Sequence, residues 1–237
     1  MTRTYILLLA AITLSACALR LGGQKPEAYS ALAIEAPAGA SAAEVADLIT
    51  SVGATLVLLT ADQDSAWFGD VSTRTGLALS GPGRTETPAK AFLSNLEILG
   101  DTSIVLGVAD GSRMHMHDAL YRIEEGRFVD MMLIGVSDRS NLREAARTLL
   151  AYIATDVGAE AAIVMAIDAT TRQAADSLAT LLRAAYTTAD ECAADASAAG
   201  TGSMRLYYGP SARVRCNTAR QIEGIGSPVL AELIVGR

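Results

Sequence analysis

Short apolar segments alternate with amphipathic segments along much of this sequence, and this order constrains the fold more than any other feature. The apolar run 31–36 predicts a strand, and 54–60 predicts a second, buried strand. Between them, 41–52 predicts a helix with Ser41 as its N-cap and Glu44 at the capping-box position. A strand, a helix and a strand in succession predict a βαβ unit with parallel strands.

The same order returns in the second half of the chain. Apolar residues at helical spacing predict helices over 140–157 and 171–186, with a buried strand at 161–167 between them. Strands at 113–123 and 127–136 form a predicted hairpin, and so do 204–208 and 213–216, followed by a last strand at 229–235. The fold class is therefore α/β or α+β, a mixed β-sheet with amphipathic helices packed on it and a C-terminal β-hairpin.

The middle of the chain has a weaker pattern. We expect 61–87 to be mostly loop with a short strand at 77–80, then a helix over 88–99 ended by Gly100, and a strongly apolar strand over 102–109. The globular domain is placed at 30–237, either as one unit or as two lobes over 30–110 and 111–237.

Composition supports a globular chain with an acidic surface. The sequence has 237 residues, 51% of them hydrophobic, and a chain of this size can bury a large core. Its formal net charge is −7. Because this charge repels polyanions, we predict no nucleic-acid partner.

The first residues have the layout of a secretory signal: Arg3, an apolar run over 5–14, small residues, and then Cys17. The segment Leu14, Ser15, Ala16 and Cys17 resembles the lipobox of bacterial lipoproteins. The resemblance implies cleavage of the signal peptide 1–16 and diacylglycerol on the Cys17 thiol, usually with a third acyl chain on the new amine.

The residues after Cys17 bear on the location of the protein. We expect residues 17–29 to be a lipidated tether that joins the domain to a membrane through its acyl chains. In lipoproteins an Asp after the modified cysteine favours retention in the inner membrane, whereas Ala18 and Leu19 occupy these positions here. The resemblance therefore implies a cell-envelope protein, on the periplasmic face of the outer membrane if the cell has two membranes.

With Cys17 acylated, Cys192 and Cys216 are the remaining cysteines. An even number in an oxidising compartment predicts a disulfide between them, and two free buried thiols are the alternative.

Three predicted strands end in an aspartate: Asp62, Asp110 and Asp168. If the strands run parallel, the three carboxylates lie along one edge of a sheet, where Asp64 could add a further oxygen ligand for a divalent metal ion. The alternative is that these residues serve as turn and cap residues.

The histidines of the chain, His115 and His117, are two positions apart on a predicted strand. This spacing places both rings on one face of the strand, within reach of one metal ion, whereas Asp118 points to the other face. The alternative is an ordinary half-exposed strand.

The sequence contains no familiar hydrolase, nucleotide-binding or zinc-protease motif. We therefore interpret the chain as a non-catalytic envelope lipoprotein that acts as a binding or assembly module, with an envelope protein as partner and no cofactor. The alternative is a lipid-anchored, metal-dependent hydrolase that uses the strand-end aspartates and a divalent metal ion.

Replacing Cys17 by Ser should release the protein from the membrane, because a thioether-linked lipid needs the thiol. Membrane fractionation and mass spectrometry of the mature N-terminus measure this. Cys192→Ser is the matched control and should stay in the membrane fraction; a Cys17→Ser protein that also stays there would contradict the prediction.

Overall fold

The structure is a computed structural model that describes residues 28–81, 89–124, 126–136, 141–156, 161–169, 171–182, 187–188, 204–209, 212–214, 220–221, 225–226 and 228–235. The helices of this part are α2 (Ala42–Ser51), α3 (Ser65–Thr75), α4 (Leu142–Asp156) and α5 (Arg172–Leu182). The strands in its first half are β1 (Ala28–Ala36), β2 (Leu56–Ala61), β3 (Ala78–Ser80), β4 (Ala89–Ser94), β5 (Glu97–Gly107), β6 (Arg113–Glu124) and β7 (Arg127–Val136). The later strands are β8 (Ala161–Ala169), β9 (Thr187–Thr188), β10 (Met204–Tyr208), β11 (Ala212–Val214), β12 (Arg220–Gln221) and β13 (Val229–Val235).

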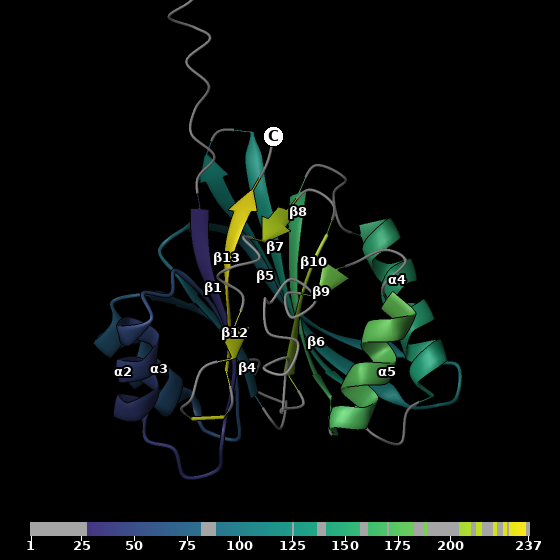
Figure 1. The fold of residues 1–237 in the computed structure, drawn as a ribbon, viewed down its shortest axis with the longest axis horizontal. Coiled ribbons are helices and arrows are strands. Elements are labelled where there is room, and N and C mark those ends of the chain that lie inside the picture. Colours follow the sequence, from purple (N-terminus) through teal and green to yellow (C-terminus); the bar gives the residue numbers. More distant parts are fainter. Residues whose placement is uncertain are drawn as a thin grey trace, which may run out of the picture.

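The elements form four layers, with two β-sheets face to face and a helix pair on each outer face (Figure 1). Sheet A has the strand order β11-β13-β1-β2-β4-β3, and sheet B has the order β5-β6-β7-β8-β10-β9. Helices α2 and α3 cover sheet A, and α4 and α5 cover sheet B. The fold is therefore mixed α+β, as the sequence predicts.

Alternation along the strands separates three apolar cores. Inward residues such as Leu58, Phe92, Leu133 and Val164 fill the space between the sheets. The residues between them in sequence face the helices, as Leu59 does beneath α2 and α3. Each fully buried side chain of this size contributes about 1.5–3 kcal/mol of transfer free energy, so the two sheets are held mainly by this central layer.

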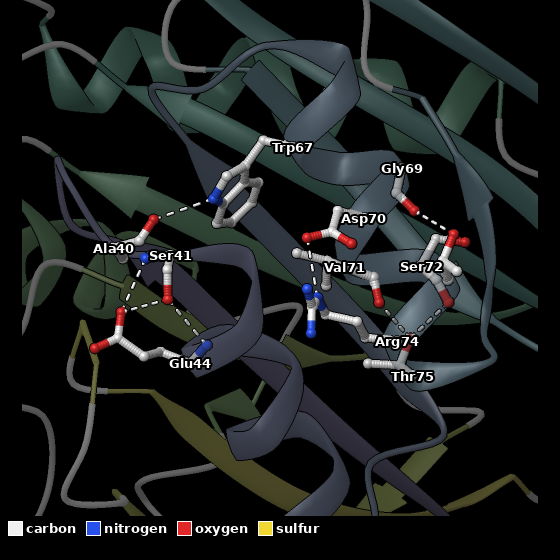
Figure 2. Close-up of polar contacts among 11 residues, drawn as sticks. Ala40, Ser41, Glu44, Trp67, Gly69, Asp70, Val71, Ser72, Arg74 and Thr75 are labelled. Atoms are coloured by element: carbon white, nitrogen blue, oxygen red, sulfur yellow. Dashed lines mark hydrogen bonds and ion pairs between the residues drawn. The ribbon is translucent and has the colours of Figure 1, made fainter.

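The predicted βαβ unit is confirmed. Strands β1 and β2 are parallel neighbours joined by α2. The Ser41 hydroxyl accepts a hydrogen bond from the Glu44 backbone N–H at 3.2 Å, and the Glu44 carboxylate accepts one from the Ser41 N–H at 2.9 Å (Figure 2). This reciprocal capping box fixes the first turn of α2 beyond the end of β1.

The segment predicted as loop, 61–87, contains a helix instead. The Asp64 carboxylate accepts a hydrogen bond from the Trp67 N–H at 2.9 Å and so begins α3. The Trp67 indole N–H then donates to the Ala40 carbonyl at 3.0 Å, which ties α3 to the start of α2 (Figure 2). The loop was predicted because the apolar pattern of α3 is weak. Asp64, which was suggested as a cation ligand, is instead the N-cap of this helix.

Two further expectations about the strands are wrong. The predicted helix 88–99 is replaced by β4, which pairs with β2, and by the start of β5. The predicted hairpin of 204–208 and 213–216 is not formed, because β10 lies in sheet B beside β8 whereas β11 lies in sheet A beside β13. In both cases pairing with distant strands decides the local structure.

Sheet B otherwise follows the prediction. Strands β6 and β7 form the expected hairpin, and β7 and β8 are parallel with α4 between them. Strand β5 differs from expectation: it was predicted as a strongly apolar strand, yet it is the outer strand of sheet B and mostly exposed. Its exposed apolar residues include Ile98 and Val105, and a register shift interrupts its pairing with β6 near Gly100.

The two ends of the domain meet in sheet A. Strand β1 pairs with β13 in antiparallel register from Ala28 opposite Ile234 to Ala33 opposite Val229. Because β1 begins at Ala28, the last two residues of the expected tether belong to the sheet. The chain passes from sheet A to sheet B between β4 and β5, and it returns to sheet A with β11, β12 and β13. The two sheets therefore do not coincide with the suggested lobes 30–110 and 111–237.

The signal peptide, Cys17, Cys192 and Cys216 lie outside the described residues, so lipidation and the disulfide stay predictions. Among the helices that the structure describes, none is long and apolar enough to cross a bilayer.

A pair of acids lies between sheet B and α4. The Tyr152 hydroxyl on α4 donates to the Asp118 carboxylate on β6 at 2.8 Å. Asp130 on β7 is buried beside Asp118, and burial raises the pKa of Asp130 far above its usual value, with the Asp118 hydrogen bond and charge adding to the effect. Asp130 is therefore protonated at neutral pH.

The pKa of Asp130 is higher in the folded than in the unfolded chain. Above about pH 4 the unfolded chain loses the Asp130 proton whereas the folded chain keeps it, so the free energy of unfolding should fall as the pH rises. Asp130→Asn removes this proton requirement and should raise the free energy of unfolding at pH 8 by about 1–3 kcal/mol, with little change at pH 4. Denaturant unfolding at both pH values measures it. The exposed Asp70→Asn is the control, and an Asp130→Asn protein with the parent's pH dependence would contradict the prediction.

Candidate functional site

Polar side chains gather where the two sheets meet at one edge of the sandwich. The C-terminal ends of β1 and β2 in sheet A and of β7 and β8 in sheet B lie at this edge, because Lys90 beside the end of β2 reaches Gly135 near the end of β7. The residues concerned occupy inward positions of neighbouring strands at this edge, near the ends of β1, β2, β7 and β8 and near the beginnings of β4 and β6. They are called the edge site here: Glu35, Thr60, Lys90, His115, Gly135 and Asp168.

Sheet A supplies one row of the edge site. Glu35 on β1 is opposite Thr60 on β2, and Thr60 is opposite Lys90 on β4. The residues two positions away on these strands, Ala33, Leu58 and Phe92, belong to the core between the sheets, so alternation turns all three side chains toward sheet B. Thr60 and Lys90 are buried, with exposed fractions of 0% and 2%, and Glu35 is half-buried.

Sheet B supplies the facing row. His115 on β6 is opposite Gly135 on β7, and Gly135 is opposite Asp168 on β8. The same alternation turns these positions toward sheet A. His115 and Asp168 are half-buried, so they can contact both the interior and solvent.

Lys90 joins the two rows. A Cβ atom placed on Gly135 would lie 3.2 Å from Lys90 Cε and 3.3 Å from Lys90 Nζ. The ammonium group thus occupies the space that a side chain at position 135 would fill, directly above the backbone of β7. It lies between His115 on one side and Asp168 on the other, because those residues are on the two strands next to β7.

The Thr60 hydroxyl in the edge site can take a further hydrogen-bond partner. Its Oγ1 atom is buried and has no hydrogen-bond partner among the described residues. A buried hydroxyl without a partner costs roughly 1–3 kcal/mol of stability, and a ligand oxygen or a water molecule can satisfy it.

His117 has a structural setting one position deeper than His115. Its ring stacks on Phe92 with centroids 5.0 Å apart, and its Nδ1 is 3.1 Å from the Ser103 hydroxyl. Gly81 approaches the same ring so closely that a Cβ there would lie 2.8 Å from His117 Nε2. The φ angle of Gly81, 81°, also favours glycine. These contacts enclose His117 in packing.

The predicted metal ligands are only partly brought together. His115 and His117 share the inward face of β6 and Asp118 the opposite face, as alternation predicts. Asp168 lies at the edge site, but Asp62 is exposed after β2. Asp110 accepts hydrogen bonds from Ser112 and from the Asn141 N–H, of which the Ser112 hydroxyl is the main cause of its lowered pKa. Asp110 therefore serves the turn and the start of α4.

Four residues of the edge site were missed in the sequence: Glu35, Thr60, Lys90 and Gly135. Glu35, Thr60 and Gly135 interrupt apolar strands at their last inward positions, and Lys90 does so at the first inward position of β4; this was the available signal. The strand position of Lys90 was also missed because its segment, 88–99, was predicted to be a helix.

No protein-family model matches the chain, and no curated protein matches it in sequence. Solved structures do match it in fold. An endonuclease/exonuclease/phosphatase from Bacteroides vulgatus is 15% identical, with a TM-score of 0.66 over 88% of this chain and 99% of that one. A mannosyl-6-phosphatase of Bacteroides thetaiotaomicron is 12% identical, with a TM-score of 0.64 over 87% of this chain and 99% of that one. The human Nocturnin catalytic domain with a bound sulfate anion is 13% identical, with a TM-score of 0.62 over 88% of this chain and 94% of that one.

The chain has the endonuclease/exonuclease/phosphatase fold. This finding contradicts the prediction of a non-catalytic binding or assembly module and of a chain that is not an enzyme, because the matching structures are nucleases and phosphatases. The comparison supports the hydrolase alternative better.

The described residues of the edge site do not fit a divalent metal ion. Within the described ranges, no group of three or more His, Cys, Asp or Glu side chains is placed to hold one. Mg²⁺ and Ca²⁺ need about six oxygen ligands, and the centre of this site is occupied by a buried ammonium group instead.

Because Gly135 leaves room for Lys90, the two positions should be energetically coupled. Gly135→Ala should destabilise the folded chain by about 1 kcal/mol, and by much less when Lys90→Ala has already removed the ammonium group. Denaturant unfolding of the two single variants and the double variant measures the coupling.

Gly100→Ala on the exposed strand β5 is the matched control, since a Cβ there meets nothing within 4 Å. Strict additivity of Gly135→Ala and Lys90→Ala would show that the side chain at 90 does not occupy this space.

Proposed function

We propose that this chain is a hydrolase of phosphate esters that acts at the edge site. The observation that carries the proposal is the meeting of two polar rows around Lys90, at an edge where strands from both sheets end. The near full-length likeness to nucleases and phosphatases supports this class of reaction.

The residues of sheet B suit the two proton transfers of hydrolysis. Asp168 and His115 flank Gly135 on opposite sides, about two strand spacings or 10 Å apart at their backbones. In the proposed reaction a water oxygen forms a bond to phosphorus while the bond to the ester oxygen breaks. The Asp168 carboxylate takes the proton of the water, and a protonated His115 donates a proton to the leaving oxygen.

Lys90 and Thr60 suit the binding of the phosphoryl oxygens. The buried ammonium group is a fixed positive charge that can stabilise the negative charge of the transition state. The Thr60 hydroxyl can donate a hydrogen bond to one of the same oxygens, which would give this buried atom a partner.

Charge favours a small substrate. The chain has a net charge of −7, which opposes a long polyanion more than a compact phosphate ester. We therefore propose a small phosphorylated molecule, with no nucleic acid as substrate or partner.

We further propose that the hydrolase works at the cell envelope. The lipobox-like segment that ends at Cys17 supports an acyl anchor, and the residues after it favour the outer membrane in a cell with two membranes. A Cys192–Cys216 disulfide would suit that compartment.

Release of p-nitrophenol from p-nitrophenyl phosphate and from its bis-ester tests the hydrolase. The full chain, purified in detergent, should hydrolyse at least one of them. Asp168→Asn should lower kcat by about 10²–10⁴-fold through loss of the base, and Lys90→Met by about 10²–10³-fold through loss of the charge.

Asp62→Asn is the matched control, because this strand-end aspartate is exposed and outside the edge site; its rate should equal that of the parent. Absence of turnover on both esters, or an Asp168→Asn protein as active as the parent, would refute the proposed function.

A further inference from the structure

We propose that the ammonium group of Lys90 is the resident cation of the edge site and takes the place of a divalent metal ion there. Its structural part, that Lys90 balances the charge of Glu35 and Asp168, stands on the geometry alone. Its catalytic part, that hydrolysis needs no metal ion, rests on the proposed function.

Burial of Lys90 requires that its charge be balanced. Lysine is rarely buried unless it is paired, and Lys90 has an exposed fraction of 2%. The edge site contains an acid in each row, Glu35 in sheet A and Asp168 in sheet B. The lysine thus lies in a site that has a carboxylate in each row.

The ammonium group lies where it can serve both rows. Lys90 begins in sheet A, two strands from Glu35, and its Nζ ends above Gly135 in sheet B, one strand from Asp168. Its side chain therefore spans the gap between the rows. An ammonium group has three donors and no acceptor, so from this position it can serve oxygen atoms of both sheets.

With Lys90 in place, the ligands that a divalent ion needs are not assembled around this position. Such an ion takes several oxygen or nitrogen ligands, and the described residues contain no group of three acids, histidines or cysteines arranged for one. A positive ion would also be repelled by the buried ammonium group at short distance. Lys90 and a divalent ion thus compete for the same negative charge.

The neighbouring glycine makes room for the lysine. A side chain at position 135 would meet the end of Lys90 at 3.2–3.3 Å, so glycine is the residue that leaves this space open. The site is therefore shaped on both sheets for the lysine.

Metal analysis and thermal unfolding of the full chain in detergent test the structural part. The parent protein should contain no stoichiometric divalent ion, and its melting temperature should be unchanged by EDTA or by millimolar MgCl2 or MnCl2. Lys90→Ala should melt at a lower temperature, and MnCl2 should raise that temperature in a way that EDTA reverses, because the two carboxylates then lack a cation.

Arg205→Ala is the matched control. Arg205 is also buried, with an exposed fraction of 2%, but it pairs with Asp176 on α5 at 2.9 Å, on the helix side of sheet B. This variant should lose stability without gaining a response to MnCl2.

A bound divalent ion in the parent, or a parent melting temperature lowered by EDTA, would overturn the inference even if Lys90→Ala fails to fold. A folded Lys90→Ala protein without any MnCl2 response would overturn it as well.

Ester hydrolysis by the parent in EDTA tests the catalytic part. The rate should be within about twofold of that in MgCl2, and a rate that depends on MgCl2 would overturn this part. If the parent has no turnover at all, the proposed function fails, and the melting experiments still decide the role of Lys90.

Discussion

Face-to-face packing of the two sheets is the constraint on which the rest of the structure depends. The inward positions of six strands are filled mainly by apolar side chains, and at the position nearest one edge of the sandwich alternation places polar residues and Gly135 beside each other. The same rule that builds the core therefore builds the edge site. A shift of one residue in any of these strands would turn its polar residue toward a helix layer.

The sequence predicted the units whose pairing is local. The βαβ unit, the capping box at Ser41, the β6–β7 hairpin and the helices α4 and α5 have clear periodicity and end signals, and the structure confirms them. Prediction failed where distant strands decide the outcome. The segment around Lys90 has residues with good helix propensity, yet β2 and β3 hold it as a strand.

The function was misjudged for a related reason. Each residue of the edge site comes from a different strand, so no short motif contains two of them, and a search for motifs finds nothing. Asp168 and His115 were found because acids at strand ends and alternating histidines can be recognised locally. Lys90 and Gly135 lie on different sheets, and their contact is visible only in the folded structure.

The antiparallel pairing of β1 with β13 has a consequence for how the protein comes to be folded. It joins residues separated by nearly the whole described chain, so the contact order of sheet A is high and its closure is slow. While the chain is being synthesised, β1 has an open hydrogen-bonding edge that β13 fills last. Sheet A can therefore be completed only after β13 has been synthesised, and a chain cut short before residue 229 would leave the β1 edge open to pairing with strands of other molecules.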